Sequence, residues 1–174
     1  LVWLYNVLVV PAASPVRSVA DLLERTRVPQ SDLSYASGGN GSPAHLVGDS
    51  FAQAARIRML HVPFKGPAEA VTALLGNQVS AMFATSSVAA PLVRGGKLRA
   101  LAVTSPQRLA ALPEVPTLAE SGMPGLALRE WEGLVAPAAT PPEILATWNQ
   151  ALFKLLAAPE LQARPEVWQR YIGI

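Results

Sequence analysis

The residues whose types and spacing could bind a ligand form one continuous run, Ser37-Gly38-Gly39-Asn40-Gly41-Ser42. A short apolar stretch precedes the run. A helix is predicted to begin at Pro43, because proline loses no hydrogen bond at the first helical position and Ser42 suits the N-cap. Glycine does not shield the backbone, so the N–H groups of residues 38–42 can point together into open space, beside the positive end of the helix dipole. These features predict a carboxylate or phosphate site, although a plain strand-to-helix connection that binds nothing shares them.

The elements that must position this run alternate between strands and helices. Alternation with short connections predicts an α/β fold with right-handed crossovers and a parallel sheet. In such sheets ligands bind beyond the carboxyl ends of the strands, so the loops at 37–42, 64–66 and 84–87 are expected to meet at one edge. The five strands are predicted at 7–10, 33–36, 58–64, 79–84 and 97–105.

Six residues in or beside these loops are further candidates for ligand binding: Ala44, His45, Lys65, Gly66, Ala84 and Thr85. His45 could donate a hydrogen bond to an anion, but a histidine at this position more often caps its own helix turn or is exposed. Lys65 at a strand end could neutralise an acid, but a lone lysine is more often just solvated.

Helix starts elsewhere in the chain carry the pattern of a polar cap followed three residues later by an acidic residue. Residues 28–32 are predicted to form a turn. Beyond Ser105 the chain is rich in proline, glycine and alanine, and a further strand is expected at 131–136. The capped helices are expected to start at Ser18 with Asp21, at Thr117 with Glu120, and at Thr140 with Glu143.

Composition restricts the function classes that fit the sequence. The 174 residues are 51% hydrophobic and 15% charged, which is a globular composition. Net charge is +2 with scattered basic residues, so nucleic acid is not an expected partner. Without cysteine there is no disulfide, thiolate metal site or cysteine nucleophile. Two histidines without neighbouring carboxylates give a metal site little support, and no cofactor is expected. The apolar first ten residues are too short to span a bilayer, and an opening in mid-strand suggests a chain cut from a longer one.

An enzyme alternative rests on the same glycine run. Gly39-x-Gly41-x-x-Ala44 matches the dinucleotide-binding fingerprint, but no acidic residue follows at the spacing that the ribose contact needs. Arg58 and Lys65 stand in that region and could suit a 2′-phosphate, so a fragment of an NADP-dependent oxidoreductase stays open. A serine hydrolase is less favoured, because Ser37 and Ser42 are not in a Gly-x-Ser-x-Gly elbow.

Five motifs in a fixed order resemble the Bug family, the extracytoplasmic solute receptors of tripartite tricarboxylate transporters. The resemblance runs from residue 7 to residue 163. The motifs are Tyr35 to Leu46 (YASGGNGSPAHL), His61 to Gly66 (HVPFKG), Gly95 to Thr104 (GGKLRALAVT), Leu112 to Gly122 (LPEVPTLAESG) and Gly133 to Pro137 (GLVAP).

The resemblance implies a non-catalytic periplasmic solute-binding protein with a type II periplasmic-binding-protein fold that closes on a small di- or tricarboxylate. Residues 6–130 would be mainly the second lobe, with a five-stranded, largely parallel sheet and flanking helices. Residues 131–174 would return to an incomplete first lobe. Backbone N–H groups of loop 37–42 would hold the carboxylate, and membrane permease subunits would be the partners.

Two departures from the family pattern affect the expected ligand. The first-lobe strand with its Pro-Gly-Gly loop has no counterpart in this chain. Met82-Phe83-Ala84-Thr85 stands where the family usually has an Asp-Asn pair after Met-Phe. Without that aspartate an acceptor for a ligand amine or hydroxyl is missing, which argues against amino acids. A third interpretation of the sequence is a degenerate protein that binds no ligand.

Overall fold

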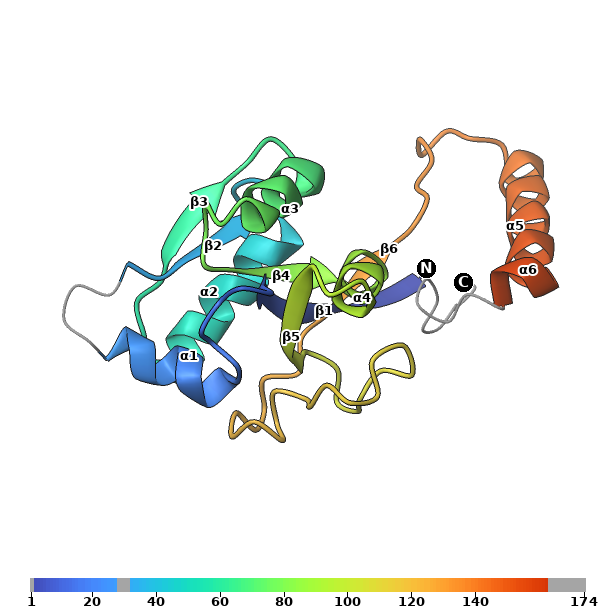
Figure 1. Cartoon of the computed structure of the whole chain (residues 1–174). Helices are drawn as coiled ribbons and strands as arrows, with labels where there is room; N and C mark the ends of the chain where they lie inside the picture. Colours follow the sequence, from blue (N-terminus) through green and yellow to red (C-terminus); the bar gives the residue numbers. More distant parts are fainter. Residues whose placement is uncertain (1, 28–31, 163–174) are drawn as a thin grey trace. The chain divides into compact units, whose positions relative to one another are not determined.

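The computed structural model describes residues 2–27 and 32–162, and it divides into two compact units (Figure 1). The first, here called the site unit, is Tyr5–Arg129. The second, here called the C-terminal unit, combines Leu1–Leu4 with the chain from Glu130 onward. All the candidate residues named above belong to the site unit.

The sheet of the site unit has the strand order β3-β2-β4-β1-β5. β2 pairs in parallel with β3 and with β4, whereas β1 is antiparallel to both β4 and β5. The expected largely parallel sheet is therefore confirmed for four strands, which run in one direction, and the parallel direction predicted from the alternation is wrong for β1. Strand–helix alternation in the sequence is the same for either direction of the first strand, so it does not reveal the reversal. The strands are β1 (Val2–Pro11), β2 (Ser34–Ser37), β3 (Leu60–Pro63), β4 (Ala81–Thr85) and β5 (Leu98–Val103).

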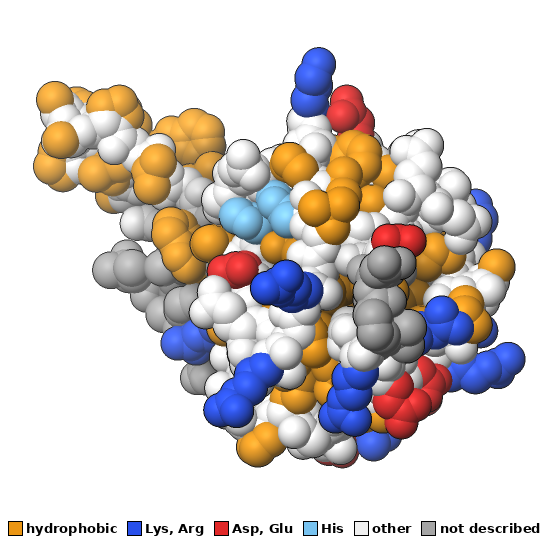
Figure 2. All heavy atoms as spheres, turned by 90° about the vertical axis from the view of Figure 1, so that its left-hand side faces the viewer, with side chains coloured by type: hydrophobic (Ala, Val, Ile, Leu, Met, Phe, Trp, Pro, Cys, Tyr) orange, Lys and Arg blue, Asp and Glu red, His pale blue; other side chains and the backbone are white. Residues whose placement is uncertain are grey.

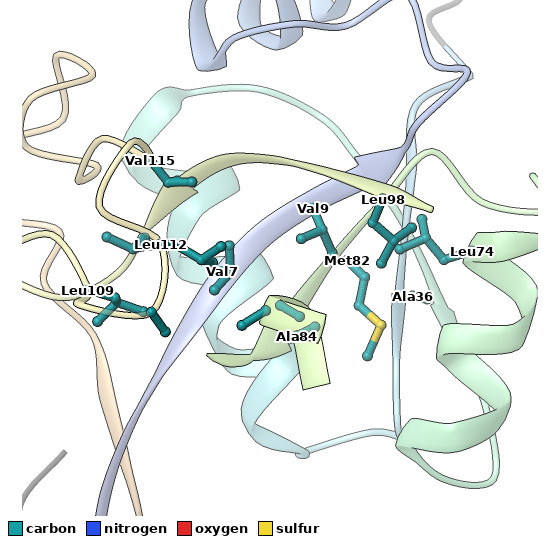
Figure 3. Close-up of a cluster of buried hydrophobic side chains, with 14 of the residues drawn as sticks. Val7, Val9, Ala36, Leu74, Met82, Ala84, Leu98, Leu109, Leu112 and Val115 are labelled. Atoms are coloured by element: carbon teal, nitrogen blue, oxygen red, sulfur yellow. The ribbon is translucent and has the colours of Figure 1, made fainter. Parts of the chain in front are cut away.

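Helices cover both faces of this sheet and enclose two apolar cores. Alternate residues of β1 and β4 point to opposite faces, as strand geometry requires. On one face Val7, Met82 and Ala84 pack with α3 and α4 (Figure 3). On the other face Leu8 and Phe83 pack with α1 and α2. The helices are α1 (Val19–Thr26), α2 (Pro43–Ala55), α3 (Pro67–Leu75) and α4 (Ser86–Arg94).

Most predicted helix starts are confirmed, but one predicted helix is absent. The Ser18 hydroxyl accepts the N–H of Asp21 at 3.0 Å and caps α1, while α2 begins at Pro43 as expected. Thr117 and Glu120 form both bonds of a capping box, yet they close a turn and no helix follows. The predicted turn at 28–32 lies mostly outside the described residues.

β3 is shorter than the predicted strand 58–64. It lies at one end of the strand order and pairs with β2 alone. Leu60 is consequently 69% exposed. The apolar residues of the predicted strand 58–64 therefore do not form a buried strand.

The C-terminal unit is built around α5 (Pro142–Leu156), which α6 (Pro159–Gln162) follows. Its N-cap is Pro141, so the expected capping box at Thr140 is not formed. The strand expected at 131–136 is shorter and begins earlier, as β6 (Arg129–Glu132), which pairs with β1. None of the residues of α5 is buried, and Trp148 is 60% exposed. Among the described helices, none combines the length and apolar character needed to cross a bilayer.

The contact between α2 and β2 depends on a glycine. A Cβ on Gly48 would lie 2.3 Å from Cε2 of the buried Tyr35 ring. In a helix interior, alanine is ordinarily favoured over glycine by about 1 kcal/mol, so the two effects have opposite signs.

We expect Gly48→Ala to lower the free energy of unfolding by about 1–3 kcal/mol, because overpacking outweighs helix propensity. Urea unfolding followed by far-UV circular dichroism measures this. Gly76→Ala is the matched control: Gly76 has φ −81° and its added Cβ would meet its nearest atom at 3.4 Å. An unchanged or raised value for Gly48→Ala would contradict the close packing of Tyr35.

Candidate functional site

Three helices begin at one edge of the sheet, and no side chain caps any of them. α2 follows β2, α3 follows β3 and α4 follows β4, and these three parallel strands are neighbours. The side chains of the N-cap residues Ser42 and Thr85 accept no backbone N–H of their helices, and Gly66 has no side chain, whereas the Ser18 side chain caps α1. The first N–H groups of a helix have no partner within the helix, so three sets of donors and three positive dipole ends are left at this edge.

The loops after β2 and β3 lie against each other. A Cβ on Gly38 would come within 3.0 Å of the Pro67 nitrogen, so a larger residue does not fit there. The N–H of Phe64 donates to the Ser37 carbonyl at 2.9 Å, which ties the two loops together. These contacts confirm that two of the three loops expected at this edge, 37–42 and 64–66, lie together.

The glycine loop already uses part of its own donor set. The N–H of Gly39 donates to Ser37 Oγ, that of Gly41 to His45 Nδ1 at 3.0 Å, and that of Ser42 to the Gly39 carbonyl. Three of the five N–H groups expected to face a ligand are thus engaged within the loop. Gly39 and Gly41 have φ values of +128° and +78°, which favour glycine.

The remaining donors of the loop region come from four residues. Within the part of the chain that the structure describes, the N–H groups of Gly38 and Asn40 have no acceptor, and the same holds for Ala44 and His45 in the first turn of α2. These four groups are available to an anion at the edge of the sheet.

Three polar side-chain atoms at the same edge are buried and without a partner among the described residues: Asn6 Nδ2, Ser42 Oγ and Ser86 Oγ. Asn6 is 1% exposed and pairs with Thr85, the last residue of β4. Ser86 is fully buried and begins α4. A buried polar atom without a hydrogen bond costs about 1–3 kcal/mol, so three such atoms at one edge point to a partner from outside the chain.

The two histidines stack on each other at this edge. The ring centroids of His45 and His61 are 3.9 Å apart with an interplanar angle of 12°, and Tyr35 stacks on His61 at 5.0 Å. His61 Nε2 lies 2.6 Å from Ser37 Oγ. Figure 2 shows the histidine side chains together in one patch of the surface.

Burial shifts the pKa of two rings in this stack, those of His61 and Tyr35. It lowers the pKa of His61 below the ordinary value for histidine; the neighbouring His45 acts in the same direction, and the carboxylate of Asp49 opposes it. Burial also raises the pKa of Tyr35. The neutral form of His61 is therefore favoured at neutral pH.

The other predicted residues differ in their access to the edge. Lys65 is exposed and its N–H donates to Glu69 Oε2 at 3.2 Å. Ala84 is buried in the core that Figure 3 shows, while Thr85 is half-buried with its hydroxyl 3.3 Å from Ser87 Oγ. No three His, Cys, Asp or Glu side chains of the described chain lie together in a way that could hold a metal ion.

Asn6 and Ser86 are site residues that the sequence analysis missed. Asn6 is the one amide inside an apolar strand, which is an anomaly that could have drawn attention. Its position at this edge follows only from the reversed direction of β1. Ser86 directly follows a buried strand, but only its neighbours Ala84 and Thr85 are named as candidates from the sequence.

Residues 1–164 match the family described as "Tripartite tricarboxylate transporter family receptor". The chain belongs to this family. A curated relative from Pseudomonas sp. (strain P51), the UPF0065 protein in the tcbD-tcbE intergenic region, is 38% identical over 157 residues, which are 90% of this chain and 47% of that protein. The chain thus spans about half the length of the curated relatives it matches.

Solved structures of similar proteins give the same fold. The Rhodopseudomonas palustris protein Rpa4515 with adipate has a TM-score of 0.89 at 31% identity, covering 95% of this chain and 56% of that one. MatC (Rpa3494) from the same organism with bound malate has a TM-score of 0.88 at 28% identity, covering 94% and 56%. This member of the receptor family therefore has a mixed α/β periplasmic-binding-protein fold, and the predicted fold class is confirmed. Receptors of this family are, as a class, substrate-binding proteins and not enzymes.

The uncapped helix starts yield a stability test. We expect Ser18→Ala to lower the free energy of unfolding by about 1 kcal/mol, because it removes a cap from α1. Ser42→Ala, also at an N-cap, should change the free energy of unfolding by less than about 0.5 kcal/mol, because its hydroxyl has no partner to lose. Urea unfolding of both variants measures the difference. Equal losses in the two variants would show that Ser42 caps α2.

Proposed function

We propose that this chain is the carboxylate-binding part of an extracytoplasmic solute receptor, which captures a small organic acid without catalysis. The observation that carries the proposal is the convergence of three uncapped helix N-termini, those of α2, α3 and α4, at one edge of the sheet. Helix N-termini favour negative charge, and their free N–H groups suit carboxylate oxygens.

The free N–H groups in and beside the glycine loop would provide the main grip on the carboxylate. Gly38 and Asn40 lie in the loop, and Ala44 and His45 lie in the first turn of α2. A carboxylate accepts at about four lone-pair sites, so one carboxylate can satisfy several of these donors at once. Lys65 and Gly66 would line the rim, with Ala84 behind it and Thr85 closing the far side.

The buried side-chain atoms favour a ligand rich in acceptors. Asn6 Nδ2 is a donor, and the hydroxyls of Ser42 and Ser86 can both donate. No carboxylate stands at 84–85 to accept from an amine, which agrees with a di- or tricarboxylate and not an amino acid. The neighbours solved with adipate and malate bind ligands of this kind.

In this proposal the site unit is the second lobe of a two-lobed receptor, and the C-terminal unit belongs to the first lobe. Ligand bound by one lobe would recruit the other, and the closed form would dock to membrane permease subunits in the periplasm. Because one lobe supplies only half of the contacts, the 174-residue chain should bind weakly.

The NADP-dependent alternative makes a different prediction about ligand. Gly39 and Gly41 would then cradle a pyrophosphate, and NADPH would bind in preference to carboxylates. Family membership and the carboxylate-bound neighbours support the receptor reading.

We expect malate or adipate to shift the backbone amide signals of Gly38, Asn40 and Ala44 in the ¹⁵N-labelled chain, with millimolar affinity. Dimethyl adipate, which lacks the charges, is the control ligand and should leave these signals unchanged. Ser42→Ala should weaken binding several-fold through the loss of one hydrogen bond. NMR titration measures all three.

Three results would count against the proposal. If the amide signals do not respond to either diacid, the proposed carboxylate site is contradicted. Micromolar binding in a calorimetric titration would contradict the half-site. Saturable quenching of NADPH fluorescence would favour the oxidoreductase.

A further inference from the structure

The glycine loop is held at two points by the histidine stack. At Gly41 the backbone N–H donates to His45 Nδ1 at 3.0 Å. At Ser37 the hydroxyl lies 2.6 Å from His61 Nε2 and also bonds both the N–H and the carbonyl of Gly39. The loop therefore has a histidine contact near each end.

The bond from Gly41 requires a neutral His45. Nδ1 can accept a hydrogen bond only when it carries no proton, so the proton of the neutral ring lies on Nε2. Protonation of His45 turns this acceptor into a donor that faces the N–H of Gly41, and the bond is lost.

The contact between Ser37 and His61 is compatible with a neutral His61 ring. The single hydroxyl proton of Ser37 can donate to the Gly39 carbonyl at 3.0 Å, and His61 Nε2–H then donates to the hydroxyl oxygen. Protonation of His61 keeps this bond but places a charge in a partly buried ring directly against His45.

The stack has a rigid base that fixes both rings. Tyr35 lies beneath His61 and is buried, and its ring occupies the space that a side chain at position 48 would need. The titratable and charged groups facing His61 are Tyr35 of β2 and the two residues His45 and Asp49 of α2. Only Asp49 favours a charged His61, and it is the weakest of the causes that act on its pKa.

We propose that His45 and His61 are positioning residues of the glycine loop: their neutral, stacked rings hold it at Gly41 and Ser37, and protonation of His45 releases it at Gly41. The loop is then ordered with its remaining N–H groups aligned while His45 is neutral, and it loosens when His45 takes up a proton. The effect on ligand affinity rests on the proposed function, whereas the response of the loop itself does not.

The sign of the pH dependence follows from the direction of the shift. The pKa of His61 is lowered in the folded chain, so its neutral form contributes stability above the ordinary histidine value of 6.5. This contribution is lost as the pH falls through the lowered pKa. A charge on the His61 ring is therefore expected only on the acidic side of pH 6.5.

NMR of the ligand-free chain between pH 7.5 and pH 4.5 tests this. We expect imidazole ¹⁵N shifts at pH 7.5 to show His45 with an unprotonated Nδ1. On acidification the amide signals of Gly41 and Gly39 should move together, and the hydrogen-exchange protection factor of Gly41 should fall about fivefold or more. The amide of Leu8 in the core is the internal control and should keep its protection.

Matched variants separate the hydrogen bond from the charge. In His45→Asn the amide oxygen can take the place of Nδ1 without titrating, so Gly41 should stay protected at both pH values. In His45→Ala protection should already be low at pH 7.5. In His61→Gln the side-chain NH₂ can take the place of Nε2 without titrating, so the contact with Ser37 should be kept at both pH values.

The proposal is overturned if His45 Nδ1 carries the proton at pH 7.5, or if His45→Asn loosens on acidification as the unmodified chain does. Should His45→Ala fail to fold, the unmodified chain and His45→Asn still decide the question. Malate titrated at pH 7.5 and 5.0 then reports on function. Absence of binding at both pH values would tell against the carboxylate site alone, and equal affinity at both would show that loop release does not control binding.

Discussion

The register of three parallel strands is the constraint on which the candidate site depends. Ser37 of β2 is level with Pro63 of β3, and Ala36 is level with Met82 of β4. β2 and β3 therefore end level with each other, and β4 continues two residues further, to Thr85, so the three helices that follow begin at the same edge of the sheet. A slip of one residue would turn Ser37 to the opposite face of the sheet and separate the loops that now touch at Gly38. Strand pairing thus determines where the helix dipoles point, and the absence of caps leaves their donors free.

The reversed strand β1 adds what the parallel strands cannot. A strand running against its neighbours begins at the edge where they end, and this brings Asn6 beside Thr85. The backbone of Asn6 is anchored, since its N–H donates to Thr104 Oγ1 and its carbonyl accepts the N–H of Thr104, both at 2.9 Å. Its side-chain amide is left buried and without a described partner. The loops therefore supply backbone donors, whereas the reversed strand supplies a side-chain donor whose position is fixed.

Local sequence signals predicted the elements well and their long-range arrangement less well. Proline at the first helical position located the start of α2, because this preference is a property of the local backbone. The direction of β1 could not be predicted from the sequence, because pairing with β4 and β5 decides it. For the same reason the sequence did not indicate that Asn6 lies at the candidate site. Ser42 is predicted to cap α2, yet its side chain makes no capping hydrogen bond. The glycine loop was located correctly, but its use of three N–H groups within itself could not be foreseen from composition.

This internal bonding changes how the loop is suited to a ligand. A loop with five free N–H groups would have many donors but little order. Ligand binding would then have to order the loop, at a cost in conformational entropy. Here Gly39 and Gly41 adopt positive φ values, and the stacked rings of His61 and His45 contact the loop at Ser37 and Gly41. The donors that remain are fewer and already oriented. Under the proposed function, affinity would then come from oriented dipoles at low entropic cost, and selectivity from buried side chains such as Asn6, which only a ligand with a matching acceptor can satisfy.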